Sequence, residues 1–136
     1  LKISKNIHIA FGQIRNNSNR EKEFLKLKKM GFKFPAIISK NAIISKNVKI
    51  GEGSIILSGC VINTGTIIGK NTIINSGSII EHDTVIGDHC HIAPGAILNG
   101  SVKVKNNCFI GSGSIIKQSV VIKNKSFIQA GKFINK

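Results

Sequence analysis

Apolar residues recur with a period of six along most of this chain. From Pro35 to Lys136 the sequence divides into 17 hexads without an insertion, and the fourth residue of every hexad is aliphatic. The second residue is small or short in every hexad except the last, where it is Lys132. Side chains two residues apart on a strand share a face. Positions two and four therefore predict the buried face of a short strand, and the Gly-, Asn- and Ser-rich positions between strands predict corners.

A strand this short cannot bury its own apolar face, so the repeats must stack on one another. The pattern resembles that of hexapeptide-repeat proteins, in which three hexads form one 18-residue coil of a left-handed parallel β-helix. We therefore expect an all-β fold class over residues 35–136. Glycines that recur once per coil are expected to be turn residues: Gly51, Gly69 and Gly87.

The third position of each hexad points outward and falls into columns in which successive members are one coil apart. Two of these columns are apolar: Ile37, Ile55, Ile73, His91, Phe109 and Phe127, and then Ile43, Val61, Ile79, Ile97, Ile115 and Phe133. Contiguous exposed apolar stripes mark an interface. The resemblance to a family whose β-helices associate in threes implies that these stripes form the contacts of a homotrimer.

Residues 1–34 do not follow the repeat and are expected to form a separate unit. Ile7–Phe11 predicts a buried strand, and residues from about Ser18 to Met30 predict a helix. Ser18 and Glu21 have the spacing of a capping box, and Gly31 is placed to end the helix. The apolar surface of this helix is expected from Leu25, Leu27 and Met30. A lone β–α unit has no core of its own, so it must dock on something.

The chain is strongly basic, with 20 Lys and Arg against six Asp and Glu and a net charge of +14. A composition bias and a polyanionic partner explain this charge equally well. Surfaces for single-stranded nucleic acid interleave basic residues with aromatic platforms. With seven Phe and neither Trp nor Tyr, the chain predicts no nucleic-acid partner.

No apolar run approaches the roughly 18 residues of a membrane span, and no signal peptide is visible. We therefore expect no membrane partner. Cys60, Cys90 and Cys108 all fall at the inward second position, which predicts reduced core thiols in a cytoplasmic protein.

His, Cys and carboxylate residues cluster between Glu81 and His91, which suggests a metal site. The repeat argues against it within one chain, because Cys90 points inward, His89 sits at a corner and His91 points outward. His82 and His91 are half a coil apart, so they could meet only across a subunit interface. A carboxylate such as Asp83 can orient a neighbouring imidazole as a base, but a solvated surface histidine also fits these residues.

Two segments are similar to the family of sialic acid O-acetyltransferases and UDP-amino-sugar N-acetyltransferases. The first runs from Asn75 to Asp88 and contains Glu-His-Asp at 81–83, and the second, His91–Gly100, begins His-Ile-Ala-Pro-Gly-Ala. The chain also resembles this family at Gly31–Pro35, where members pass from an N-terminal domain into the β-helix. The resemblance implies that residues 1–34 are the last β–α unit of a Rossmann-like sugar-nucleotide domain, in a fragment of a longer protein.

The same resemblance implies a site and a reaction. His82 would be the general base and Asp83 would strengthen it, while His91 would face acetyl-CoA across the subunit interface. Gly100 would stack on His82, where a backbone N–H can approach a thioester oxygen. Backbone around Ser112 and Ala130 would line the CoA channel.

The expected activity is direct acetyl transfer from acetyl-CoA, without a metal, to the amino group of a nucleotide-linked amino sugar in surface glycan biosynthesis. Three alternatives stay open from the sequence: O-acetylation of a sialic acid, a zinc hydratase on the same fold, and an inactive structural β-helix. The zinc alternative needs a close downstream histidine pair, and His89 and His91 have the wrong spacing and facing for it.

Overall fold

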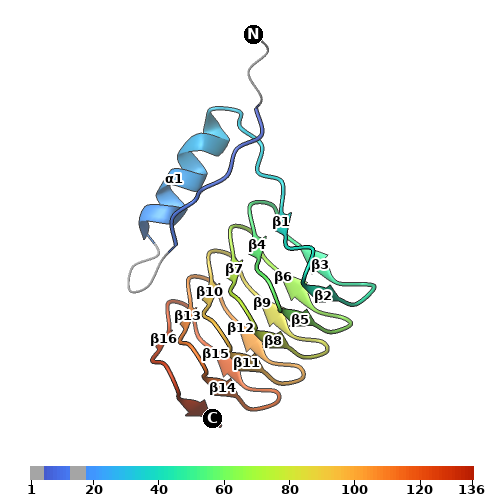
Figure 1. Ribbon diagram of the computed structural model, residues 1–136. Coiled ribbons are helices and arrows are strands. Elements are labelled where there is room, and N and C mark those ends of the chain that lie inside the picture. Colours follow the sequence, from blue (N-terminus) through green and yellow to red (C-terminus); the bar gives the residue numbers. More distant parts are fainter. Residues whose placement is uncertain (1–4, 13–17) are drawn as a thin grey trace.

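The structure, a computed structural model, describes residues 5–12 and 18–136, and Figure 1 shows a solenoid of short strands with one helix beside it. Each strand covers the third and fourth positions of one hexad. The strands are β1 Ile37–Ile38, β2 Ile43–Ile44, β3 Lys49–Ile50, β4 Ile55–Ile56, β5 Val61–Ile62, β6 Ile67–Ile68, β7 Ile73–Ile74, β8 Ile79–Ile80, β9 Val85–Ile86, β10 His91–Ile92, β11 Ile97–Leu98, β12 Lys103–Val104, β13 Phe109–Ile110, β14 Ile115–Ile116, β15 Val121–Ile122, β16 Phe127–Ile128 and β17 Phe133–Ile134.

The strands form three parallel sheets, because every strand pairs with the strand three places further along the chain. Their orders are β1-β4-β7-β10-β13-β16, β2-β5-β8-β11-β14-β17 and β3-β6-β9-β12-β15. Paired residues are always three hexads apart, as in the pairing of Ile79 with Ile97. The predicted parallel β-helix with three hexads per coil is confirmed, and its left hand stays a prediction.

The core follows the predicted alternation. Fourth-position side chains from Ile56 to Ile122 are buried, and small second-position side chains such as Cys90 and Ala96 are buried beside them. The end coils are less well covered, since Ile38 is exposed and Ile134 is only partly buried. The repeats therefore bury a continuous column of aliphatic side chains only where a coil lies on each side.

From Asn47 onward, each corner turns through a residue in the left-handed region at the first hexad position. Seven of these residues are glycines between Gly53 and Gly131, and eight are not, among them Asn47, Asp83 and Lys125. The predicted turn glycines Gly51, Gly69 and Gly87 do not take this left-handed position; Gly51 instead begins a turn, in which the Ser54 N–H donates to its carbonyl at 3.3 Å. These three lie at the fifth position, where a Cβ on Gly69 would come within 2.5 Å of the Gly87 carbonyl carbon. Close approach of the next coil, not turn geometry, requires glycine there.

Helix α1 spans Ser18–Lys29, close to its predicted range. Gly31 ends it with φ +84°, as expected, and the Gly31 and Phe32 N–H groups donate to the carbonyls of Lys28 and Leu27. The proposed capping box rests on the Ser18 side chain, which lies outside the described residues. The predicted strand Ile7–Phe11 is absent, and a single parallel bridge joins Asn6 to Lys33 instead.

Phe24, which the helical pattern did not single out, packs both inside the N-terminal unit and against the β-helix, where it lies beside Gly53 and the ring of His89. Phe24 is buried against Ile9 and Phe34, whereas the expected Leu25 and Met30 are exposed. Arg20 is 1% exposed and donates two hydrogen bonds, to the carbonyl oxygens of Ile9 (2.6 Å) and Phe11 (2.7 Å). Desolvation by burial lowers the pKa of Arg20 to about 10.

This docking covers part of the first apolar column. Ile73 and His91 are only 5% and 7% exposed, because residues 10–12 lie over them, whereas the end residue Phe127 is exposed. The second column keeps more of its apolar surface open, with Ile43 68% and Phe133 61% exposed at its two ends. The expectation that both columns are free outer surfaces therefore holds for the second column alone.

Replacing Gly69 with Ala should destabilise the solenoid, because the new methyl group would meet Gly87 backbone that has no room to shift. Overpacking of this kind costs about 1–3 kcal/mol. Gly77→Ala is the control, since Gly77 has φ +68° and no atom within 4 Å of a built Cβ, so it carries only the left-handed penalty of about 1 kcal/mol. Thermal unfolding followed by circular dichroism should give a lower Tm for Gly69→Ala than for Gly77→Ala. Equal values would contradict the packing explanation.

Candidate active site

The corner between β8 and β9 presents a histidine and an aspartate that are joined by a hydrogen bond. His82 Nδ1 lies 2.9 Å from Asp83 Oδ2, and both side chains are exposed. Asp83 occupies the left-handed turn position with φ 59°, and its N–H donates to the Thr64 carbonyl at 3.0 Å. An ionised carboxylate can only accept, so the hydrogen is on Nδ1. The lone pair of His82 is then on Nε2, where it can take a proton.

Gly100 lies on the next coil directly against the imidazole, as the spacing of one coil predicts. A Cβ on Gly100 would be 2.7 Å from His82 Nε2 and 2.8 Å from Cε1. The backbone holds the two coils in this register, because the Ser101 N–H donates to the His82 carbonyl at 2.9 Å. The absence of a side chain at 100 therefore leaves the basic nitrogen beside bare backbone.

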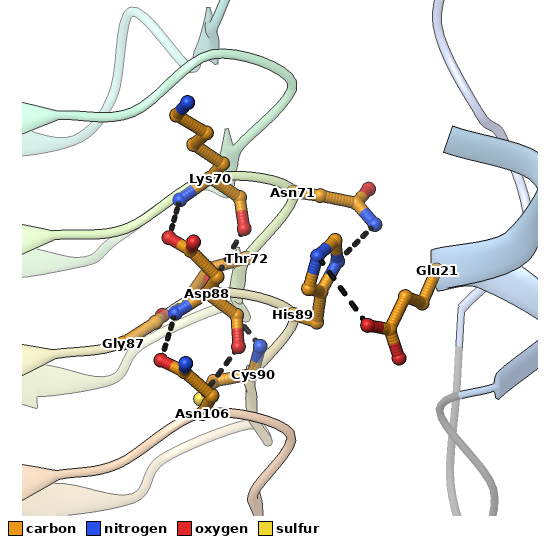
Figure 2. A network of polar contacts seen from close by, with 9 residues as sticks. All are labelled: Glu21, Lys70, Asn71, Thr72, Gly87, Asp88, His89, Cys90 and Asn106. Carbon is orange, nitrogen blue, oxygen red and sulfur yellow. Dashed lines mark hydrogen bonds and ion pairs between the residues drawn. The ribbon is translucent and has the colours of Figure 1, made fainter. Parts of the chain in front are cut away.

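The sixth-position N–H groups differ between corners of the coil. At the corner that holds Asp88, three successive N–H groups of this kind donate to a carboxylate or amide oxygen on the next coil. Lys70 donates to Asp88 at 2.7 Å and Asp88 to Asn106 at 3.0 Å, as Figure 2 shows, and Asn106 donates to Asn124 at 2.9 Å. The Gly100 N–H, at the same hexad position, makes no such bond within the described part of the chain. An N–H group without a protein partner beside His82 can donate to a ligand oxygen.

His91 lies in β10, on a different side of the coil from the corner that carries His82. Asn75 Nδ2 donates to His91 Nε2 at 3.1 Å, and the ring packs edge-on against Phe109. A cavity of about 260 Å³ opens beside this ring, between residues 10–12 and the strands. One protomer thus does not bring His82 and His91 together, in agreement with the half-coil spacing.

Ser112 and Ala130 lie on the corner that follows the His91 face of the coil. They are exposed and one coil apart, and the Gly131 N–H donates to the Ser112 carbonyl at 2.9 Å. The structure therefore places both residues along one edge of the solenoid, away from the corner of His82. Their role in holding CoA stays a prediction.

The third corner binds helix α1 through His89, a contact that the sequence did not indicate. His89 is buried. It lies beside Asn71 and Glu21 (Figure 2), and its ring packs edge-on against Phe24. Asn71 Nδ2 donates to His89 Nδ1 at 2.9 Å, and His89 Nε2 lies 3.9 Å from Glu21 Oε1. The neighbours His89 and His91 therefore contact different parts of the N-terminal unit and do not share a site. Among residues 5–12 and 18–136, no three His, Cys, Asp or Glu side chains are grouped to hold a metal ion.

Two family descriptions match the repeat region. "Bacterial transferase hexapeptide (six repeats)" matches residues 65–100, and "Hexapeptide repeat of succinyl-transferase" matches residues 102–136. Together these matches span more than half of the chain. The chain belongs to the hexapeptide-repeat transferases. No curated protein has significant similarity to the chain.

Solved structures of other hexapeptide-repeat transferases resemble this one over nearly its whole length. The acetyltransferase domain of PglB from Neisseria gonorrhoeae is 28% identical, with a TM-score of 0.92 over 98% of this chain and 65% of that chain. WeeI from Acinetobacter baumannii is 33% identical, with a TM-score of 0.88 over 96% of this chain and 63% of that chain. The present chain therefore spans about two thirds of the length of these relatives.

A perosamine N-acetyltransferase from Caulobacter crescentus shares the fold at 23% identity, with a TM-score of 0.75 over 94% of this chain and 67% of that chain. The PglB domain has also been solved in complex with acetyl coenzyme A, with 27% identity and a TM-score of 0.89 over 97% of this chain and 66% of that chain.

The cysteines of this hexapeptide-repeat transferase are core residues, as predicted. Cys60, Cys90 and Cys108 are free thiols with no exposed surface. Desolvation by burial raises the pKa of Cys60, and the hydrogen bond with Cys108, together with burial, raises the pKa of Cys90. A thiol with a raised pKa is a poor nucleophile. The hydrogen bond with Cys90 lowers the pKa of Cys108 to about 7, and for this thiol it is burial that prevents contact with a substrate. Within the described residues, no helix is both long and apolar enough to cross a bilayer.

Docking of the N-terminal unit should weaken as the pH falls below about 6.5, the ordinary pKa of histidine. Desolvation by burial lowers the pKa of His89, although Glu21 and Asp88 act in the opposite direction and Arg20 in the same one. As the pH is lowered, His89 is therefore protonated in the unfolded chain before it is protonated in the folded one. The free energy of unfolding decreases over this pH range, until His89 is protonated in the folded protein too. Above the pH range in which His89 is protonated, its contribution to the free energy of unfolding is fully present.

Urea unfolding followed by circular dichroism should show this decline as the pH is lowered from about 7.5 through 6.5. His89→Gln should make it shallower, because the variant has no proton to take up at that site. His8 has a pKa lowered by burial and by Arg20, and should account for part of the decline that remains. A pH dependence that is identical in wild type and His89→Gln would contradict the assignment.

Proposed function

We propose that the protein transfers the acetyl group of acetyl-CoA to the amino group of a nucleotide-linked amino sugar. The observation that carries this proposal is the corner at β8–β9, where Asp83 orients His82 and Nε2 is left beside the backbone of Gly100. An oriented, exposed base next to an N–H donor is what acyl transfer to an amine requires.

One of the relatives supports the acetyl donor. The PglB acetyltransferase domain, at 27% identity, binds acetyl coenzyme A. The more distant Caulobacter structure, which supports the fold alone, is a perosamine N-acetyltransferase in complex with CoA and GDP-perosamine. Acetyl-CoA is therefore the donor that we propose, and no step of the transfer requires a metal ion.

The reaction that fits this site is direct attack within a ternary complex. The sugar nitrogen attacks the thioester carbonyl while His82 Nε2 accepts a proton from it, and Asp83 stabilises the resulting imidazolium through Nδ1–H. The Gly100 N–H donates to the oxygen that becomes negative. This attack forms the C–N bond; the carbonyl then re-forms, the C–S bond breaks, and the CoA thiolate takes the proton from His82 Nε2, which restores the base. A covalent enzyme intermediate is not part of this proposal, because all three cysteines are buried.

A second copy of the chain completes the site in this proposal. Within one protomer His91 lies on a different side of the coil from His82, so the His91 that contacts acetyl-CoA would belong to a neighbour. Because that side chain is only 7% exposed, acetyl-CoA would reach it through the cavity beside its ring. The second apolar column, from Ile43 to Phe133, offers exposed surface for that contact. We therefore propose a homotrimer, with CoA lying along the edge marked by Ser112 and Ala130.

Replacing His82 with Ala should abolish turnover, because no other base lies beside the attacking nitrogen. The measurement is CoA release with a panel of nucleotide-linked amino sugars, and a general base accounts for about 10²–10⁴-fold of the rate. Asp83→Asn should also lower kcat strongly, because an amide that donates to Nδ1 favours the wrong imidazole tautomer.

The controls for His82→Ala are the mass in solution by light scattering and acetyl-CoA affinity by calorimetry, both of which should match wild type. Retained turnover in His82→Ala would overturn the role of the base. Wild-type protein that releases no CoA with any acceptor would instead favour a structural β-helix.

A further inference from the structure

The carboxylate of Asp83 is packed against a glycine of the preceding coil. Gly65 lies one coil before Asp83, and a Cβ built on Gly65 would overlap Asp83 Oδ1 and lie 3.4 Å from Asp83 Cγ. Gly100 stands in the same relation to His82 on the following coil. The His82–Asp83 pair thus occupies a slot whose two walls are glycines.

We propose that Gly65 is a positioning residue, whose missing side chain leaves the space in which the Asp83 carboxylate can hold His82. The inference rests on the proposed function, since it concerns the orientation of the base. Gly65 does not contact the imidazole or a substrate, so it acts only through Asp83.

The requirement for glycine at 65 does not come from backbone geometry alone. Gly65 has φ +74°, in the left-handed region, but eight non-glycine residues take up the equivalent position at other corners, with φ between 51° and 63°. Gly59, one hexad earlier, has φ +73°, and a Cβ there would lie 3.7 Å from the nearest atom, an ordinary contact. The corners therefore accept side chains at this position, and Gly65 differs from them by its contact with Asp83.

Asp83 has little freedom to move away from a side chain at 65. Its N–H is bonded to the Thr64 carbonyl at 3.0 Å, and the Ser101 N–H holds the neighbouring His82 carbonyl at 2.9 Å. The backbone is thus tied to the coils on both sides, so the carboxylate must rotate about its own side-chain bonds. Rotation takes Oδ2 away from His82 Nδ1, and the imidazole then loses the acceptor that fixes its tautomer.

The test compares Gly65→Ala with Gly59→Ala in the full chain, because the two positions have matched backbone angles. Gly65→Ala should lower kcat for CoA release by about 10²-fold, the scale of a small misplacement in a catalytic group. Its KM for acetyl-CoA should be unchanged, and Gly59→Ala should behave as wild type. Equal activity of the two variants would overturn the proposal.

A second measurement reports on His82 without any substrate. The ¹⁵N chemical shifts of the His82 ring should indicate Nδ1–H in wild type and in Gly59→Ala, and a shift toward Nε2–H in Gly65→Ala. A purely structural glycine would leave this tautomer unchanged, which would overturn the proposal. The two proposals can fail separately. Full turnover in His82→Ala would contradict the proposed function, but the ¹⁵N shifts of the His82 ring would still show whether Gly65 positions Asp83.

The double variant Gly65→Ala/Asp83→Ala separates the contact from any general effect on the coil. With the carboxylate removed, Gly65→Ala should cause no further loss of kcat beyond that of Asp83→Ala. If Gly65→Ala alone fails to fold, the double variant should fold with a Tm close to that of Gly59→Ala. A double variant that loses activity additively, or that also fails to fold, would contradict the inference.

Discussion

The pairing of every strand with its counterpart on the next coil is the constraint on which this structure depends. It places equivalent positions of successive coils in contact through the whole solenoid, so a single register decides which side chains meet. Gly65 meets Asp83, His82 meets Gly100, and Asn71 meets His89 by this rule alone. One inserted residue would break these contacts together, which explains why the corners tolerate varied side chains while the hexad length stays fixed.

The three corners of the coil share this geometry but carry different chemistry. At one corner, the side chains of Asp88 and Asn106 accept hydrogen bonds from backbone N–H groups, and His89 is buried against α1. A second corner carries Ser112 and Ala130 on an exposed edge. The corner of His82 has neither a ladder of capping side chains nor a covering helix. Its imidazole is therefore exposed, yet oriented by Asp83, and these two properties make it a better candidate base than the buried His89 or His91.

The sequence predicted the features that depend on the repeat and missed those that depend on docking between units. The six-residue period alone predicts the strands, the core, the inward cysteines and the stacking of Gly100 on His82. The predicted strand at Ile7–Phe11 is absent: within the described residues its backbone pairs with the rest of the chain only through the bridge of Asn6 with Lys33, and the Ile9 and Phe11 carbonyls accept from Arg20 instead of from a strand. The burial of Phe24 and of His91 was not predicted. It results from contacts of α1 and residues 10–12 with the solenoid, and a repeat period in the sequence does not indicate such contacts. The catalytic role of His82, the trimer and the left hand of the coil stay predictions.

The most direct test of the site is whether His82→Ala chains, which lack the base, and His91→Ala chains, which lack the contact to acetyl-CoA, restore activity to each other. A site that combines His82 of one protomer with His91 of its neighbour should reappear when His82→Ala and His91→Ala chains are co-expressed with different tags and purified as mixed oligomers. In the proposed trimer, every ring that contains both variants has one intact site out of three, so about a third of the wild-type CoA release with the best nucleotide-linked amino sugar should return. Mixed oligomers no more active than either variant alone would contradict a site shared between protomers.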